Sequence, residues 1–383
     1  MKLLHTADWQ IGKRYGQFDP EEAALLAEAR FDVVSRIAEL ANSQGVDLVL
    51  VAGDVFDAQG VSDRTVLRLF QLISGFAGPW VMIPGNHDAG LAESVWTRAA
   101  RLGAIPPNAH VCFRAEPLTL SDPGVVILPA PLTQRHTYED LTRWFDSVAT
   151  PVGVPRIGLA HGSVQGILAE DIDATNPIAP ERSALARLDY LALGDWHGTK
   201  QIGDRTWYSG TPETDRFRNN DSGQVLLVEL AAPGAVPTVT PITTGRYRWR
   251  YIERELQLAS DVCELVQELE TFDTNDVVQL KLSGHVDLES HLSMSRAVGQ
   301  TQARTRSLLV DLSGLRIQPT DDDIRALHAD GYLGEVIADL RAQEGDENAE
   351  LARDALALLA GILDETRATS ANGGNNEVIS SSH

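Results

Sequence analysis

Five short polar groups stand out in this sequence because they carry side chains that bind metal ions. They are Asp8 with Gln10, the segment GDVFD at 53–57, the segment GNHD at 85–88, His161, and the segment GDWH at 194–197. Two divalent metals about 3.5–4 Å apart clamp a phosphate and lower the pKa of a bridging water, which is how many enzymes hydrolyse phosphoesters. Any one of these groups alone is explained by an ordinary turn or a structural histidine. Together they predict a metal site for phosphoester hydrolysis.

Each polar group follows a short apolar stretch that is typical of a strand. The stretches in the first two-thirds of the chain are residues 2–5, 46–52, 80–83, 125–129, 156–160, 190–193, 206–209 and 224–230. Between the first two, Asp19 as cap, Pro20 in the first turn and Gly45 as terminator predict a helix with an apolar face. Alternating strands and helices predict a layered α/β domain, whose ligand sites lie beyond the carboxyl ends of the strands.

The pattern changes near Gly245. Arginines alternate with aromatic residues over 246–251, which is a strand period. A helix at 261–270, a strand at 277–283, a helix at 288–302 and a strand at 307–312 follow, giving a compact α+β unit. We therefore predict a first domain at 1–244, a second at 245–318, a helical segment at 319–368 and a disordered polar tail at 369–383.

Composition restricts the partners and the compartment. The 383 residues carry 54 acidic against 32 basic side chains, a net charge of −22. That charge argues against a protein that holds DNA by bulk electrostatics, but it does not exclude a nuclease whose metals or partner supply the positive field. Cys112 and Cys263 lie far apart and form no metal-type pair. With no charged-then-apolar leader and no apolar run of about 18 residues, we expect a cytoplasmic protein without membrane spans.

The order of the motifs resembles the calcineurin-like metallophosphoesterase superfamily. Within it, HTADW at 5–9, AGDVFD at 52–57 and PGNHD at 84–88 are similar to the SbcD-type DNA exonuclease subunits. The resemblance implies a four-layer β-sandwich flanked by helices, with a smaller α+β capping domain and C-terminal helices. In that family the terminal helices dock onto the coiled-coil base of an ATPase partner, SbcC.

The resemblance also implies a role for each motif residue. Asp54 would bridge the two metals. The other metal ligands would be Asp8, Gln10 and His197 on one ion, and Asn86, His161 and Asp195 on the other. His87 would be the catalytic histidine that protonates the leaving oxygen or stabilises developing charge, oriented by Asp57 or Asp88.

Two positions depart from the family pattern, which has histidine at Gln10 and at Asp195. Both replacements offer oxygen in place of nitrogen, and oxygen ligands favour harder ions. We therefore expect Mn²⁺, with Mg²⁺ as the alternative and Zn²⁺ disfavoured. Arg216 and Arg218 are the predicted substrate contacts, because they follow the GDWH motif. The arginines at 246–250 are better explained as the solvent side of a half-buried strand.

Three functions fit these residues. The first is a DNA nuclease subunit that works with an SbcC-like ATPase, with homodimerisation left open. The second is a small-molecule phosphodiesterase or phosphatase, which explains the site but not the long C-terminal extension. The third is a metal-binding but catalytically weak assembly subunit, which explains the two departures but not the retention of the other motif residues.

Overall fold

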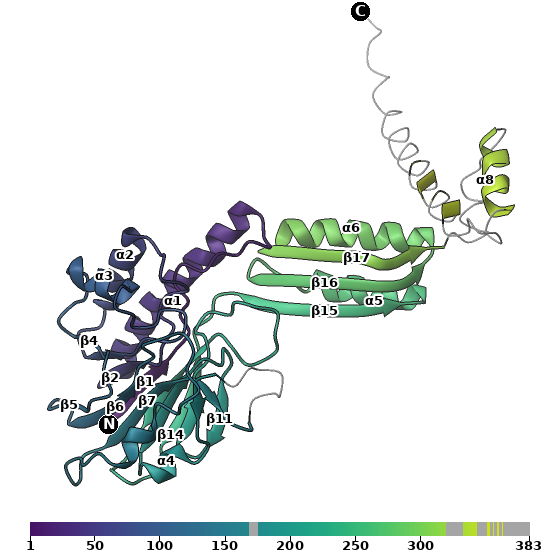
Figure 1. Ribbon diagram of the computed structural model, residues 1–383. Coiled ribbons are helices and arrows are strands. Elements are labelled where there is room, and N and C mark those ends of the chain that lie inside the picture. The colour runs from purple at the N-terminus through teal and green to yellow at the C-terminus, as the bar shows by residue number, and fades with distance from the viewer. Residues whose placement is uncertain are drawn as a thin grey trace, which may run out of the picture. The chain divides into compact units, whose positions relative to one another are not determined.

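The computed structural model describes residues 1–167, 175–318 and 332–342, with a few further positions between 351 and 362. The chain divides into two compact units, Met1–Arg248 and Trp249–His383 (Figure 1). The predicted polar tail at 369–383 and most of the predicted helical segment at 319–368 lie outside the described residues.

Two six-stranded sheets form the centre of the first unit. The first sheet contains β1 (Lys2–Thr6), β2 (Leu48–Val51), β3 (Trp80–Met82), β4 (Ala109–Val111), β13 (Gln224–Glu229) and β14 (Thr238–Thr243). Its strand order is β14-β13-β1-β2-β3-β4, and β1 to β4 run parallel. The carboxyl ends of β1, β2 and β3 therefore meet at one edge.

The second sheet repeats this arrangement. It contains β5 (Leu118–Leu120), β6 (Val125–Ala130), β7 (Arg156–His161), β10 (Tyr190–Gly194), β11 (Lys200–Gly203) and β12 (Thr206–Tyr208). Its order is β11-β12-β10-β7-β6-β5, with β6, β7, β10 and β12 parallel. A small parallel pair, β8 (Ser163–Val164) and β9 (Pro177–Ile178), follows β7.

The two sheets face each other across a buried apolar core that includes Leu50, Ile157 and Tyr190. The outer face of the first sheet packs against helices α1 (Pro20–Gln44), α2 (Asp63–Ile73) and α3 (Val95–Arg101). Outside the second sheet lie the short helices η1 (Arg143–Asp146) and α4 (Arg182–Leu185). This is the layered α/β fold predicted from the sequence (Figure 1).

Helix α1 shows how local sequence determines one of these layers. Pro20 stands in the first turn, and Gly45 ends the helix at a left-handed φ of 59°. Leu26 and Ile37 recur on its buried face. Asp19 occupies the N-cap position, as predicted, but its side chain makes no capping hydrogen bond.

The second unit contains one three-stranded sheet, of order β15-β16-β17. Its elements are β15 (Arg248–Leu256), α5 (Ala259–Glu270), β16 (Asp276–Val286), α6 (Leu288–Arg304), β17 (Ser307–Ile317) and, further along, α8 (Tyr332–Ala342). Residues of α5, α6 and all three strands share one apolar core. The predicted strand–helix–strand–helix–strand pattern is thus present.

The arginines before and in β15 are engaged within the chain. Arg246 lies 3.5 Å from Asp32, and Arg250 Nε donates to Asp276 at 2.8 Å. These pairings agree with the solvent side of a half-buried strand rather than with a surface that binds a nucleic-acid backbone. Among the described helices, none is both long and apolar enough to cross a membrane.

Candidate metal centre

The carboxyl ends of strands from both sheets bring the sequence-predicted residues together. Asp8 follows β1, Asp54 follows β2, and His161 ends β7. Ligand atoms of these three side chains all lie within 4.8 Å of one another, and all three residues are buried. Two carboxylates and an imidazole at this spacing are a suitable donor set for a divalent metal ion.

Backbone strain is concentrated in the turns that present these carboxylates. Asp8 has a φ of 54°, Gln10 of 49° and Asp54 of 53°, in the left-handed region. Each such residue costs roughly 1–2 kcal/mol. The turns hold each other in place, because the Asp8 amide donates to Gly53 O at 3.1 Å and the Gln10 amide to Asp54 O at 3.0 Å. Strain of this kind persists where the surrounding structure fixes it, most often at functional sites.

Two glycines allow the turns to approach closely. A Cβ on Gly85 would lie 2.2 Å from Asp54 Oδ1, and a Cβ on Gly53 would lie 2.4 Å from His161 Nδ1. No side chain fits at either position without moving the predicted ligands. The glycines of the GDVFD and GNHD motifs are therefore required by packing at the site.

His161 is held with one nitrogen facing the predicted ligands. Its Nδ1 donates to the Ala52 carbonyl at 2.8 Å, so Nε2 carries the lone pair in the neutral ring. Nε2 lies 3.1 Å from Asn86 Oδ1, 3.6 Å from Asp54 Oδ1 and 3.7 Å from Asp195 Oδ1. The three oxygens and this nitrogen are the set predicted for one metal ion.

The electrostatics of the site favour a cation. Burial opposes protonation of His161, but the carboxylates of Asp54, Asp8 and Asp195 outweigh burial and raise its pKa to about 9. Burial, reinforced by Asp54 and Asp195, raises the pKa of Asp8 to about 6. The His161 shift reflects the crowded carboxylates, whereas the Asp8 shift mainly reflects burial. A bound divalent metal would supply positive charge to these carboxylates.

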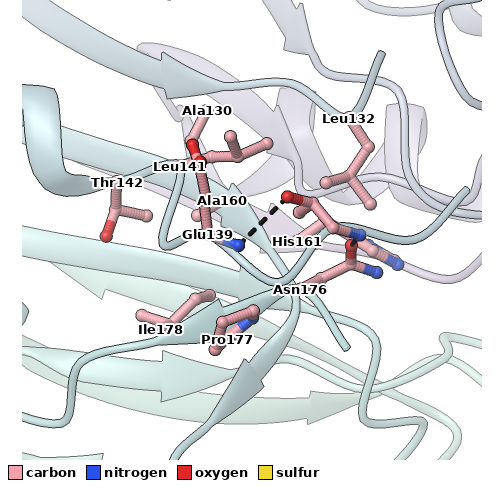
Figure 2. A pocket seen from close by; sticks show the side chains of 11 residues that line it. Ala130, Leu132, Glu139, Leu141, Thr142, Ala160, His161, Asn176, Pro177 and Ile178 are labelled. Carbon is pink, nitrogen blue, oxygen red and sulfur yellow. Dashed lines mark hydrogen bonds between the residues drawn. The ribbon is translucent and has the colours of Figure 1, made fainter. Parts of the chain in front are cut away.

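A small cavity lies beside His161, lined also by Asn176, Leu132 and Pro177 (Figure 2). His161 and Asn176 are neighbours in its wall. The cavity measures about 10 Å³, which is room for about one water. It is therefore too small for a substrate.

Gln10 supplies a direct test of whether the residues fit a metal. Its Nε2 donates to Asp54 Oδ2 at 2.7 Å, which identifies the other amide atom as the oxygen. Among the described residues, this buried Oε1 has no hydrogen-bond partner. A buried unpaired carbonyl oxygen is costly, and a metal ion would satisfy it. The donor set therefore fits a divalent metal.

His197 is hydrogen-bonded to Asp215, an acidic residue that lies outside the sequence motifs. Its Nδ1 lies 3.1 Å from Asp215 Oδ2, and Asp215 also accepts from Lys13 at 2.6 Å and from Arg216 Nε at 3.0 Å. Burial alone would raise the pKa of Asp215, but His197, Arg30 and Arg216 lower it well below its usual range. Asp215 is thus an ionised carboxylate beside a predicted metal ligand, the arrangement that orients ligating imidazoles. His197 lies outside the tight group of Asp8, Asp54 and His161.

The predicted substrate-contact arginines differ in their surroundings. Arg216 is engaged with Asp215, and its Nη2 lies 2.8 Å from His197 Nδ1, so it contacts a predicted metal ligand. Arg218 is exposed, and its amide donates to Arg216 O at 2.9 Å.

His87 lies next to the buried group. Its amide donates to Asp54 Oδ1 at 2.9 Å, and its Nε2 is 4.0 Å from Asp54 Oδ2. Its Nδ1 donates to the carbonyl of Asp57 at 2.8 Å, so the backbone of Asp57, rather than its carboxylate, orients the ring. Asp88 accepts from the amides of Gly85 and Phe56. Asp88 therefore shapes the turn that carries His87, whereas the ring is hydrogen-bonded to the Asp57 carbonyl.

A family match covers the domain that carries these residues. The chain matches the calcineurin-like phosphoesterases over residues 1–228, which is more than half its length. The chain belongs to this family. Members use divalent metals, and the group of Asp8, Asp54 and His161 fits such a site. The family and the site together indicate phosphoester hydrolysis.

A solved structure adds a weaker likeness. The crystal structure of TT1561 of Thermus thermophilus is 12% identical, with a TM-score of 0.42 over 63% of this chain and 98% of that chain. At that level of similarity it adds nothing to the family match.

Proposed function

We propose that this phosphoesterase is a metal-dependent DNA nuclease, the nuclease subunit of an SbcC–SbcD-like DNA repair complex in the cytoplasm. The observation that carries the proposal is the buried group of Asp8, Asp54 and His161, with the His87 ring beside it. The nuclease assignment is supported by the resemblance of HTADW, AGDVFD and PGNHD to the SbcD-type subunits. The α+β unit after the phosphoesterase domain and helix α8 beyond it support the same layout.

Two divalent ions would be held, with Asp54 as a ligand available to both. Asp8, Gln10 and His197 would hold one, and Asn86, His161 and Asp195 the other. When bound, the metals neutralise the phosphodiester and acidify the attacking water. Asp215 orients His197 through Nδ1, and the Ala52 carbonyl orients His161 in the same way. Oxygen donors from Gln10 and Asp195 make Mn²⁺ the expected metal, followed by Mg²⁺, with Zn²⁺ disfavoured.

His87 has the geometry of a proton donor to the leaving oxygen. Because its Nδ1–H is committed to the Asp57 carbonyl, Nε2 is the nitrogen that gains and loses a proton. The side chain is 35% exposed, whereas the Asp54 side chain beside it is buried. His87 can therefore reach a phosphodiester that approaches from solvent and act as general acid.

Binding of a long anionic substrate needs positive charge, and this chain carries 54 acidic against 32 basic side chains. The metals are the first source, and exposed Arg218 is the second. An SbcC-like ATPase that docks on the C-terminal helices would be the third. Self-association into a homodimer is compatible with this proposal.

A small-molecule phosphodiesterase is the alternative supported by the same site. The discriminating experiment supplies Mn²⁺ to the purified protein and compares single- and double-stranded DNA with bis-p-nitrophenyl phosphate and cyclic nucleotides. We expect cleavage of DNA, with the ATPase partner present if the chain alone is slow. Cleavage of cyclic nucleotides but of no DNA would establish the alternative, and cleavage of none would indicate an assembly subunit.

A further inference from the structure

Arg30 is a fully buried cation behind the candidate metal centre. It lies on α1 and is 1% exposed. Its guanidinium makes five hydrogen bonds, to Trp9 O at 2.7 Å, Asp8 O at 3.2 Å, Tyr15 Oη at 3.1 Å, Thr211 Oγ1 at 2.9 Å and Glu213 O at 3.1 Å. All five acceptors belong to the segments that follow β1 and β12.

A buried guanidinium needs an explanation other than fold stability. Desolvating a charge is expensive, and apolar residues of similar volume usually stabilise a core as well or better. Arg30 is surrounded by neutral acceptors, and its nearest acidic neighbours, Asp215 and Glu213, act on it through space. What arginine supplies here is five donors in one rigid plane, which no other side chain offers.

The first segment that Arg30 holds is the strained turn after β1. The left-handed conformation at Asp8 and Gln10 places the carbonyls of Asp8 and Trp9 towards the helix layer, away from water. On its other side the same turn is hydrogen-bonded to the turn after β2, because the Asp8 amide donates to Gly53 O and the Gln10 amide donates to Asp54 O. Arg30 satisfies the carbonyl side, so the turn is fixed on both sides.

The second segment carries the partner of His197. Thr211 accepts from Arg30 through Oγ1 and donates its own amide to the His197 carbonyl at 3.0 Å. The Glu213 carbonyl, two residues before Asp215, accepts from the same guanidinium. One side chain therefore joins the Asp8 turn to the loop that positions His197 and Asp215.

We propose that Arg30 is a positioning residue of the metal centre, which sets the separation of Asp8 from His197 by holding both of their loops. Its five hydrogen bonds all go to acceptors within the chain. The inference rests on the proposed metal-binding role of Asp8 and His197, and it does not depend on which phosphoester is cleaved.

The test measures Mn²⁺ affinity on metal-free protein, by calorimetry and by the EPR signal of free Mn²⁺. Arg30→Lys keeps the charge but loses the planar donors, and we expect its Mn²⁺ affinity to fall about 10- to 100-fold, as for other groups that orient metal ligands. Val34→Ala is the matched control, because Val34 is buried on the same helix among apolar residues. It should lower the melting temperature and keep wild-type Mn²⁺ affinity. Arg68→Lys, at a surface arginine paired with Glu28, should change neither.

Thr211→Val is the second variant, for the case in which Arg30→Lys does not fold. It removes one acceptor of the guanidinium and leaves the charge in place, and its Mn²⁺ affinity should fall in the same direction. Wild-type affinity in folded Arg30→Lys, or in Thr211→Val, would overturn the inference. So would an equal loss of affinity in Val34→Ala.

Failure of the Arg30 inference can be distinguished from failure of the proposed nuclease function. If the wild-type protein binds Mn²⁺ and Arg30→Lys does not, the inference holds even when no DNA is cleaved. If the wild-type protein binds no divalent metal, both the inference and the metal-dependent mechanism are wrong.

Discussion

Replacing Gln10 by alanine distinguishes two roles for this residue, a metal ligand and an ordinary buried polar residue. In the metal-free protein the substitution removes the bond from Nε2 to Asp54 Oδ2, and a hydrogen bond to a charged group contributes about 1.5–3 kcal/mol. It also removes the unpaired buried Oε1, whose burial costs about 1–3 kcal/mol. The two effects nearly cancel. We therefore expect the free energy of unfolding of the metal-free protein to change by less than about 2 kcal/mol.

The metal-loaded protein should respond differently. If Oε1 is a ligand, Gln10→Ala lowers Mn²⁺ affinity by about 10- to 100-fold. That factor corresponds to about 1.4–2.8 kcal/mol, which appears as a smaller Mn²⁺-dependent rise in stability. The assay is urea unfolding with and without Mn²⁺, together with direct Mn²⁺ titration.

Gln59→Ala is the control for Gln10→Ala. Gln59 is half-buried and makes two neutral hydrogen bonds, to Ala89 O and from the Val95 amide. Its loss should lower stability equally with and without Mn²⁺. Unchanged Mn²⁺ affinity in Gln10→Ala would refute the ligand assignment, and a large loss of metal-free stability would show that Gln10 is a structural residue.

Three further substitutions test the roles of other residues in the phosphoesterase domain. His87→Ala should reduce turnover by about 10²- to 10⁴-fold, because the general acid is lost. Mn²⁺ affinity should be retained, because the amide of residue 87 still donates to Asp54. An equal loss of metal binding and activity would contradict this. Asp215→Asn should lower Mn²⁺ affinity by about 10-fold or more, as measured by titration, because the carboxylate that orients His197 becomes neutral. Burial lowers the pKa of His5 to about 3. Below about pH 6.5 the unfolded chain therefore binds a proton at His5 that the folded chain does not bind. The free energy of unfolding should fall by about 1.4 kcal/mol per pH unit down to about pH 3. Urea unfolding at pH 7, 6 and 5 should show this slope reduced in His5→Gln and unchanged in His136→Gln, at an exposed histidine; parallel slopes in wild type and His5→Gln would contradict it.

Much of the fold was predictable because its strands are apolar and end abruptly. Each predicted strand in the phosphoesterase domain is present, and the groups of Asp8, Asp54 and His161 lie at the strand ends as expected. The signal was strong because glycine and acidic residues follow directly on buried runs. The three-residue strands β4 and β5 were not predicted, because a polar residue interrupts each of them and most of their residues are only half-buried or exposed.

The residues that support the site were not predictable in the same way. Asp215 and Lys13 meet across about 200 positions of the chain, and Arg30 meets Thr211 across a similar distance. No local periodicity marks such pairs. For Arg30 there was one usable signal, since a charged residue stands on the apolar face of a helix, beside Leu26 and Val33. A charge at such a position is buried only when it has partners.

The most direct test of the account is the rate of Mn²⁺-dependent phosphodiester hydrolysis in wild type and Asp54→Asn, measured side by side on DNA and on bis-p-nitrophenyl phosphate. Asp54 contacts Gln10 and the His87 amide and lies within 4.8 Å of Asp8 and His161. We predict hydrolysis by wild type and a loss of at least about 100-fold in Asp54→Asn. Equal rates in the two proteins, or hydrolysis that persists after removal of all divalent metal, would contradict it.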